Sequence, residues 1–296
     1  MSKFILIGGI PRSGTNLTRR IIGSHSKIAI PPTEFQFLKR FSQGKSVSEI
    51  LANEKLGQWN VDFSDLHDRK HREVFIDALV RYAESIGKEI PGEKSPLNEF
   101  FYDTIREWLN DFELRFIHVM RNPLDAIASL KHAAFRNVNR RRNTIDVSAR
   151  SRNWVRSVSM GLARAHCNSE GYYLLKFEDL ATDPVSTTQE LCEFLGVDFE
   201  QERMLSLSDF EKYPDNTSFA QNRGKKHQEY GAIHKPESRK HYLTDSEIRI
   251  VSSICGELAR ALGYEDENLK CSPPERGSSG TMKKLRRAAR NFLRLR

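Results

Sequence analysis

The chain has 296 residues, of which 38% are hydrophobic and 29% charged, a composition typical of one large globular α/β domain. The formal charge of +8 is confined to the C-terminal end, because residues 270–296 hold nine Lys or Arg and one acid. Residues 1–269 therefore carry no net charge, which argues against a domain that binds nucleic acid through a basic surface. The four cysteines form no CxxC pair, so no zinc site or redox motif is indicated and no metal is expected.

Membrane and export signals are weak in this sequence. No apolar run is long enough to span a bilayer, and the short run at Phe4–Ile7 lacks the length and the cleavage site of a signal peptide. We therefore expect a cytoplasmic protein with one domain over residues 1–270. Residues 271–281 have the composition of a linker. Residues 282–296 place apolar side chains near one helical face, so this basic tail is expected to be either disordered or a peripheral contact with an anionic membrane.

Strands and helices are expected to alternate along the chain. Buried strands are predicted at Phe4–Ile7, Phe116–Met120 and Tyr172–Phe177. Helices are predicted at Thr15–Ile22, over much of 35–87, at about Glu99–Leu109, from Pro123 onward, at Thr188–Leu195 and at Thr244–Leu262. The Pro91-Gly92 dipeptide predicts a turn. This alternation predicts right-handed βαβ units and an α/β fold whose central, mostly parallel sheet is flanked by helices.

A glycine-rich loop separates the first strand from the first helix. Residues 9–16 read Gly-Ile-Pro-Arg-Ser-Gly-Thr-Asn, with glycines five positions apart, and backbone N–H groups in such a loop can hold an anion at a helix N-terminus. An NTPase would have a lysine after Gly14, but Thr15 stands there, and the cation of the loop is Arg12. The loop is therefore predicted to bind an anion other than a triphosphate. The candidate binding residues are Pro11, Arg12, Ser13, Gly14, Thr15 and Asn16.

A second anion site is suggested by Arg121 and Ser129. Arg121 ends a predicted strand, at the sheet edge where ligands bind in open α/β folds. Asn122 is a suitable N-cap for the helix that follows, and Ser129 lies two turns into that helix on the face of Asp125. A guanidinium and a hydroxyl that face one crevice suit a phosphate. By themselves these two residues are also compatible with a solvated helix face.

Together, the loop and the Arg121–Ser129 pair resemble the nucleotide sites of sulfotransferases that use 3′-phosphoadenosine 5′-phosphosulfate (PAPS). The tyrosylprotein and glycan branches are the most similar. Weaker matches are Glu93–Pro96, Lys176–Leu180 and Ile233–Pro236, and the resemblance spans roughly residues 3–265. It implies a P-loop-like three-layer fold and PAPS as co-substrate. The loop would hold the 5′-phosphosulfate, Arg121 and Ser129 would hold the 3′-phosphate, and Lys235 would lie in the segment that closes over the donor.

The resemblance also implies three catalytic residues. Arg12 would hold the phosphosulfate, Lys94 would neutralise the leaving oxygen, and Glu34 would accept the proton of the acceptor hydroxyl. From the residues alone, Lys94 is better explained as an ordinary surface lysine paired with the preceding Glu93. Glu34 is equally a first-turn residue that helps to cap a helix. His25 is a competing base, although its place after the first helix favours a capping role.

The acceptor is expected to be a hydroxyl of a carbohydrate, a tyrosyl peptide or a lipid. Phe177 stands where many relatives have tyrosine, and Phe35 and Gln36 replace polar and basic residues of the tyrosylprotein branch. The arginine-rich stretch 136–156 is either a solvated helix or a lid that receives an anionic acceptor. Two other functions remain open. One is a P-loop kinase of a small molecule, disfavoured by the missing lysine, and the other is a non-catalytic nucleotide-binding protein.

Overall fold

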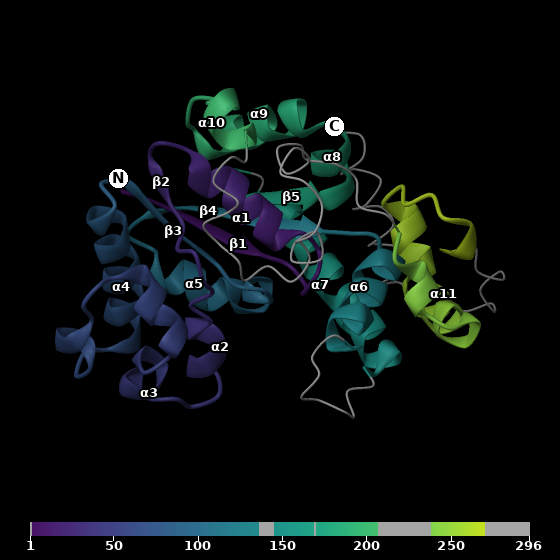
Figure 1. The fold of residues 1–296 in the computed structure, drawn as a ribbon, viewed down its shortest axis with the longest axis horizontal. Helices are drawn as coiled ribbons and strands as arrows, with labels where there is room; N and C mark the ends of the chain where they lie inside the picture. The colour runs from purple at the N-terminus through teal and green to yellow at the C-terminus, as the bar shows by residue number, and fades with distance from the viewer. Residues whose placement is uncertain (1, 136–144, 169, 207–237, 270–296) are drawn as a thin grey trace, which may run out of the picture.

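The computed structural model describes residues 2–135, 145–168, 170–206 and 238–269. Its centre is a sheet of five strands, shown in Figure 1. The strands are β1 (Lys3–Gly8), β2 (Ile28–Ala29), β3 (Ile90–Lys94), β4 (Glu113–Met120) and β5 (Tyr172–Lys176). Their order in the sheet is β2-β3-β1-β4-β5, and each neighbouring pair is parallel. The predicted parallel sheet is therefore confirmed.

Helices cover both faces of the sheet, which makes the fold a three-layer α/β arrangement of the P-loop-like type. The α-helices are α1 (Thr15–Ser24), α2 (Phe37–Phe41), α3 (Val47–Leu51), α4 (His71–Ser85), α5 (Tyr102–Trp108), α6 (Pro123–Phe135), α7 (Val147–Cys167), α8 (Phe177–Thr182), α9 (Pro184–Leu195), α10 (Gln201–Leu205) and α11 (Asp245–Ala261). Short 3₁₀ helices are η1 (Glu54–Trp59), η2 (Ser64–Leu66), η3 (Asn98–Phe101), η7 (Lys240–Tyr242) and η8 (Glu267–Leu269). No helix in the described ranges is long and apolar enough to cross a membrane.

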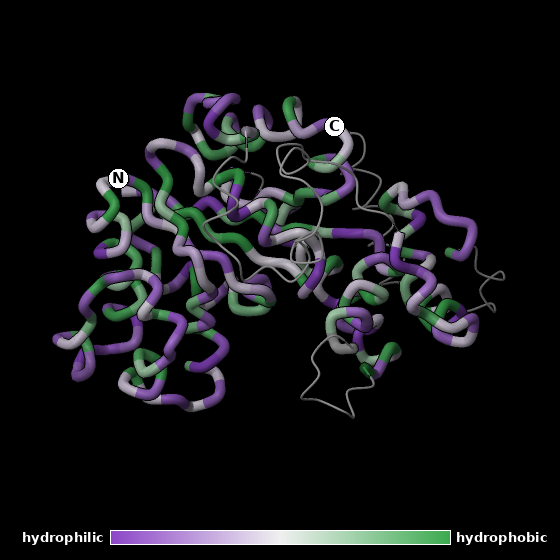
Figure 2. The backbone as a smooth tube through the Cα atoms, in the orientation of Figure 1, coloured by the Kyte–Doolittle hydropathy of each residue, from purple (hydrophilic) through white to green (hydrophobic). Residues whose placement is uncertain are grey.

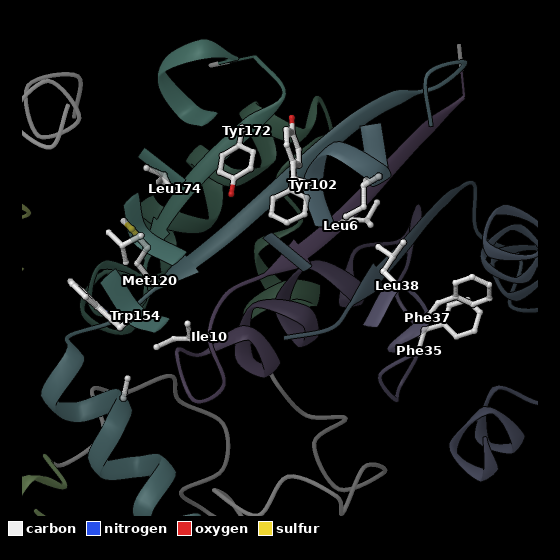
Figure 3. Packing of buried hydrophobic residues seen from close by; sticks show 14 of the residues in the cluster. Leu6, Ile10, Phe35, Phe37, Leu38, Tyr102, Met120, Trp154, Tyr172 and Leu174 are labelled. Carbon is white, nitrogen blue, oxygen red and sulfur yellow. The ribbon is translucent and has the colours of Figure 1, made fainter. Parts of the chain in front are cut away.

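The two layers of helices pack against alternate residues of β1. Phe4 and Leu6 belong to a core shared with α4, α5, α6, α7 and α11, whereas Ile5 and Ile7 belong to a second core shared with α1, α8, α9 and α10. All four side chains are fully buried, because successive side chains of a strand point to opposite faces. Figure 2 shows the strands as hydrophobic segments at the centre, and Figure 3 shows Leu6 in the first core. A continuous apolar run is what a strand covered on both faces requires.

Local signals predicted some details correctly and others wrongly. The side chain of Asn122 accepts the N–H of Leu124 at 2.9 Å, which confirms the predicted cap of α6. Thr244 and Glu247 form a capping box at the start of α11. The turn predicted at Pro91-Gly92 is wrong, since both residues lie in β3. A Cβ on Gly92 would lie 2.6 Å from the carbonyl oxygen of Ile5, so the glycine lets β3 approach β1 closely.

The helix predicted at about Glu99–Leu109 begins later than expected, because η3 occupies its first turn and α5 starts at Tyr102. The predicted linker and basic tail, residues 271–296, lie outside the described residues. The carboxyl ends of β1, β3, β4 and β5 share one edge of the parallel sheet. In open α/β sheets this edge is where ligands bind, and the predicted site residues follow these strand ends.

Candidate functional site

The loop after β1 has a tight backbone shape. Gly9 and Gly14 have φ angles of 135° and 106°, in a region that favours glycine. A Cβ on Gly14 would lie 2.2 Å from the Phe177 ring, and one on Gly9 would lie 2.4 Å from the Val119 carbonyl oxygen. Arg12 also has a positive φ, 77°, which costs energy for a residue with a side chain. Such strained backbone is characteristic of ligand sites.

The end of this loop is suited to an anion. α1 starts at Thr15, and its N-cap, Gly14, has no side chain that could cap the first N–H groups. These groups form the positive end of the helix dipole. Ser13 is fully buried, and its Oγ has no hydrogen-bond partner among the described residues. A buried hydroxyl left this way is costly, so Ser13 fits a ligand oxygen held by the loop.

Two arginines donate hydrogen bonds to Ser129 beside the loop, and a third arginine contacts the loop backbone next to them. The Nε of Arg12 donates to Ser129 Oγ at 3.1 Å, and Arg239 donates to the same oxygen at 3.3 Å. Arg121 donates to the Arg12 carbonyl oxygen at 3.2 Å. These guanidiniums come from the β1–α1 loop, from the residue after β4 and from the segment before η7. Three cations directed at neutral oxygen atoms in one place favour a ligand with more than one negative charge.

Arg121 is held from two sides. Its guanidinium carbon lies 4.5 Å from the centre of the Phe177 ring, a cation–π contact. Burial lowers the pKa of Arg121 and the nearby Arg239 adds to this, while Asp125 and Glu178 oppose it; arginine nevertheless stays charged. Its Nε is buried without a hydrogen-bond partner among the described residues. A phosphate oxygen would satisfy that donor, so the chemistry here fits the anionic nucleotide that the resemblance implies.

Lys94 and Glu34 form a partly buried ion pair at the end of β3. Lys94 Nζ donates to Glu34 Oε1 at 2.7 Å, and the other carboxylate oxygen of Glu34 accepts from Gln36 at 2.7 Å. Lys94 is only 3% exposed, so it is not a surface lysine, and its partner is not Glu93. Glu34 precedes α2 instead of lying in its first turn. The structure therefore brings together two residues that are 60 positions apart.

The charge states of this pair follow from its surroundings. Burial alone would raise the pKa of Glu34, but the charge and the hydrogen bond of Lys94, with help from Gln36, hold that pKa below its ordinary value. Burial lowers the pKa of Lys94, and Glu34 opposes this shift. Glu34 is therefore ionised at neutral pH, as a base must be. A cation and a base in contact can serve the leaving group and the entering hydroxyl of a transfer reaction.

Glu93 supports the Lys94–Glu34 pair through a set of buried hydrogen bonds. Its carboxyl group accepts hydrogen bonds from Ser95 Oγ and from the side-chain amide of Asn98. Ser95 Oγ in turn accepts the N–H of Gln36 at 2.9 Å. Burial raises the pKa of Glu93 to about 7, against the effect of those hydrogen bonds. These contacts connect the strand that carries Lys94 to the segment that carries Glu34.

His25 lies at the opposite end of α1 from the loop. Its Nδ1 accepts the N–H of Lys27 at 3.1 Å, so its Nε2 carries the proton and donates to the Asp198 carbonyl oxygen at 3.0 Å. It is 1% exposed. These contacts are those of a structural histidine after a helix end, and they do not favour His25 as the base.

The remaining predicted site residues differ in burial, and some of them lie outside the described residues. Thr15 is buried at the start of α1, and Pro11 and Asn16 are half-buried beside it. Lys235 and residues 136–144 lie outside the described residues. Of the arginine-rich stretch, Arg150, Arg152 and Arg156 are exposed on α7.

Two site residues were not predicted as such. Arg239 is not part of a recognisable motif in the sequence. Phe177 could have been found by the rule that located Arg121, since it directly follows a buried strand, β5, at the same sheet edge.

The chain is similar to known sulfotransferases. A model of the Sulfotransferase family matches residues 5–201, about two thirds of the chain. Carbohydrate sulfotransferase 1 of Danio rerio is 30% identical over 126 residues, which are 41% of this chain and 28% of that protein. The match thus spans less than a third of that relative's length.

A solved sulfotransferase domain shows the same fold. The sulfotransferase domain from the curacin biosynthetic pathway is 19% identical, with a TM-score of 0.54, and the match covers 90% of this chain and 99% of that domain. The sulfotransferase domain from the Synechococcus PCC 7002 olefin synthase is 20% identical with a TM-score of 0.49, covering 85% and 94% of the two chains. Because the family match covers well over half of its residues, this chain belongs to the sulfotransferase family.

Proposed function

We propose that this protein transfers a sulfuryl group from PAPS to an acceptor hydroxyl and releases adenosine 3′,5′-bisphosphate. The observation that carries the proposal is the cluster of three arginines beside the glycine loop, in which Arg12 and Arg239 donate to Ser129 and Arg121 donates to the Arg12 carbonyl oxygen. The loop and the arginines offer places for two separate anionic groups, and PAPS carries one at the 5′ and one at the 3′ position. ATP carries only a 5′ chain, and Thr15 replaces the lysine that would serve it.

In the proposed reaction, a bond forms between the acceptor oxygen and sulfur while the bond from sulfur to the 5′-phosphate oxygen breaks. The hydroxyl proton passes to Glu34, which Lys94 keeps ionised. Charge develops on the leaving oxygen, and the ammonium of Lys94 and the guanidinium of Arg12 stabilise it. Lys94 thus has two roles in sequence. It first pairs with Glu34 and keeps it ionised, and it then stabilises the negative charge that develops on the leaving oxygen.

A carbohydrate hydroxyl is the first acceptor class to test. The support is the similarity to a protein named carbohydrate sulfotransferase 1, which is 30% identical over 126 residues, or 41% of this chain. Tyrosyl peptides and hydroxylated lipids are the other classes.

The test compares ligands and then products. Calorimetry should show tighter binding of adenosine 3′,5′-bisphosphate than of ATP. Incubation with PAPS and a panel of carbohydrates, tyrosyl peptides and lipids should yield an acceptor whose mass has increased by one sulfuryl group. Tighter binding of ATP, or an acceptor that gains a phosphoryl group from ATP, would instead support a kinase.

A further inference from the structure

A buried chain of hydrogen bonds lies behind the glycine loop. The N–H of Gly9 donates to Glu99 Oε2 at 2.7 Å, and Ser157 Oγ donates to Glu99 Oε1 at 2.7 Å. His118 Nε2 lies 3.0 Å from Ser157 Oγ, and His118 Nδ1 lies 2.9 Å from the hydroxyl of Tyr172. The four side chains are at most 2% exposed. They come from η3, β4, α7 and β5, so the chain links the loop to the middle of the fold.

The hydrogen bonds of this chain have a preferred donor-to-acceptor direction, from Tyr172 to Glu99. Burial lowers the pKa of His118 to about 3, so the imidazole is neutral, with one donor and one acceptor nitrogen. If Tyr172 donates to Nδ1, then Nε2 donates to Ser157, and Ser157 donates to Glu99, so every group is satisfied. The reverse direction would leave the Tyr172 hydroxyl proton without an acceptor among the described residues. Burial raises the pKa of Glu99, but the hydrogen bond from Ser157 and the backbone N–H groups oppose this.

Both backbone groups of Gly9 are held by the same short segment. Glu99 accepts its N–H, and the N–H of Leu97 donates to its carbonyl oxygen at 3.0 Å. A Cβ on the preceding Gly8 would lie 3.0 Å from the backbone nitrogen of Glu99, so the segment fits closely against the loop. Leu97 itself has a positive φ of 74°, a conformation that this packing imposes.

The contacts of Leu97 and Glu99 with Gly9 restrict the backbone of the loop. Glycine explores more backbone conformations than any other residue, so Gly9 alone would let the loop adopt many shapes. An anion-binding loop is useful only when its N–H groups already point at one place, because ordering it on binding would cost affinity. Lys94 begins the same connection, three residues before Leu97. The segment from Lys94 to Glu99 therefore joins the transfer chemistry to the donor loop.

We propose that Glu99 is a positioning residue for the sulfuryl donor, which fixes Gly9 so that the loop presents its N–H groups and Arg12 to the 5′-phosphosulfate. Ser157, His118 and Tyr172 hold Glu99 in place from α7 and the sheet. Because Glu99 is fully buried, it would act through Gly9 and not by direct contact with the donor. This inference rests on the proposed function, because it takes PAPS as the donor.

The test compares two nucleotides that differ at the loop. Adenosine 3′,5′-bisphosphate carries a 5′-phosphate for the loop, whereas adenosine 3′-monophosphate carries only the group expected near Arg121. Replacing Glu99 by methionine keeps the length of the side chain and removes both acceptors. We expect Glu99→Met to weaken binding of the bisphosphate by about tenfold and binding of the monophosphate by no more than about twofold.

A graded series and a matched control accompany this variant. In Glu99→Gln the amide oxygen can still accept the N–H of Gly9 if the direction of the hydrogen bonds reverses. Most of the affinity for the bisphosphate should therefore be retained. Tyr172→Phe removes the far end of the chain and should have the smallest effect. The rings of Tyr102 and Tyr172 are neighbours in Figure 3, and their centres are 4.8 Å apart. Tyr102→Phe removes a hydroxyl that accepts from Asn168, outside the hydrogen-bond chain. It should leave both affinities unchanged.

Each outcome has one meaning. A loss confined to the bisphosphate, with recovery in Glu99→Gln, supports the inference. Equal losses for both nucleotides in Glu99→Met would show that Glu99 only supports the fold and would overturn it. If Glu99→Met does not fold, Ser157→Ala is judged by the same comparison of the two nucleotides. If the unmutated protein bound neither nucleotide, the proposed function would be overturned, and the inference with it.

Discussion

The two halves of the site use charge in opposite ways. On the donor side, Arg12 and Arg239 direct hydrogen bonds at the neutral hydroxyl of Ser129. On the transfer side, the charge of Lys94 is matched by that of Glu34 at 2.7 Å. Positive charge directed at a neutral hydroxyl suits an anionic ligand, whereas a matched ion pair keeps each group in the charge state that the transfer step requires. The first arrangement suits binding and the second suits turnover, and this difference can be tested.

The largest effect is expected from Glu34→Gln, which keeps size and hydrogen bonding but removes the base. Turnover should fall by roughly 10²–10⁴ while donor affinity stays near that of the unmutated protein. The loss should shrink for a phenolic acceptor, whose hydroxyl is already acidic and needs less help to lose its proton. Single-turnover rates with an alkyl and an activated phenolic acceptor measure this. Equal losses with both acceptors would indicate that Glu34 orients the acceptor instead.

Lys94→Met should lower turnover by about 10²–10³ with both acceptors, because the leaving oxygen loses its cation. It should also move the pH profile. Lys94 holds the pKa of Glu34 down, and Glu34 acts only when ionised, so activity falls as pH drops through that pKa. Without Lys94 the pKa rises, and the acidic limb of the rate profile should shift to higher pH.

Lys55→Met is the control for this shift, because Lys55 lowers the pKa of Glu34 by charge alone and is the smallest contributor. Its acidic limb should move less than that of Lys94→Met. If the acidic limb of the rate profile does not move in Lys94→Met, then the loss of activity at low pH is due to a group other than Glu34.

Arg121→Ala should weaken binding of adenosine 3′,5′-bisphosphate by about 1.5–3 kcal/mol, because a charge-assisted contact is lost. Ser129→Ala and Arg239→Ala should act in the same direction with smaller losses. Calorimetry against adenosine 5′-monophosphate tests the position of the contact, since that ligand lacks the 3′ group. Arg152 is a matched control, an exposed arginine that bonds Ser148 on α7. If Arg121→Ala weakens both nucleotides equally, its place at the 3′-phosphate is wrong.

The smallest effect concerns the stability of the donor side. Gly14→Ala should lower the free energy of unfolding by about 1–3 kcal/mol, because its φ is 106° and the new Cβ would meet the Phe177 ring. Gly44→Ala is the control, since Gly44 also has a positive φ, 76°, but nothing lies within 4 Å of its Cβ position. Thermal unfolding of both variants separates backbone strain from the clash. Similar losses would show that contact with Phe177 contributes little.

Features carried by neighbouring residues could be predicted from the sequence. The apolar run at Phe4–Ile7 predicted a strand, the spacing of Gly9 and Gly14 predicted an anion loop, and Asn122 predicted a helix start; the first and the last are confirmed by β1 and by the cap of α6. The turn predicted at Pro91-Gly92 was wrong because local preference gave way to pairing with β1. A parallel strand at the centre of a sheet is stabilised by its neighbours more than by its own residues.

The sequence by itself determined the class of fold and the family, and it predicted an anion-binding loop, because these depend on periodicity and on motifs a few residues long. Only the tertiary structure decided that Lys94 pairs with Glu34 and not with Glu93, and that Arg239 reaches Ser129. It alone placed Glu99 behind Gly9, 90 positions away. Each of these contacts joins segments that meet only when parallel strands bring their carboxyl ends to one edge, and no local pattern encodes such a meeting.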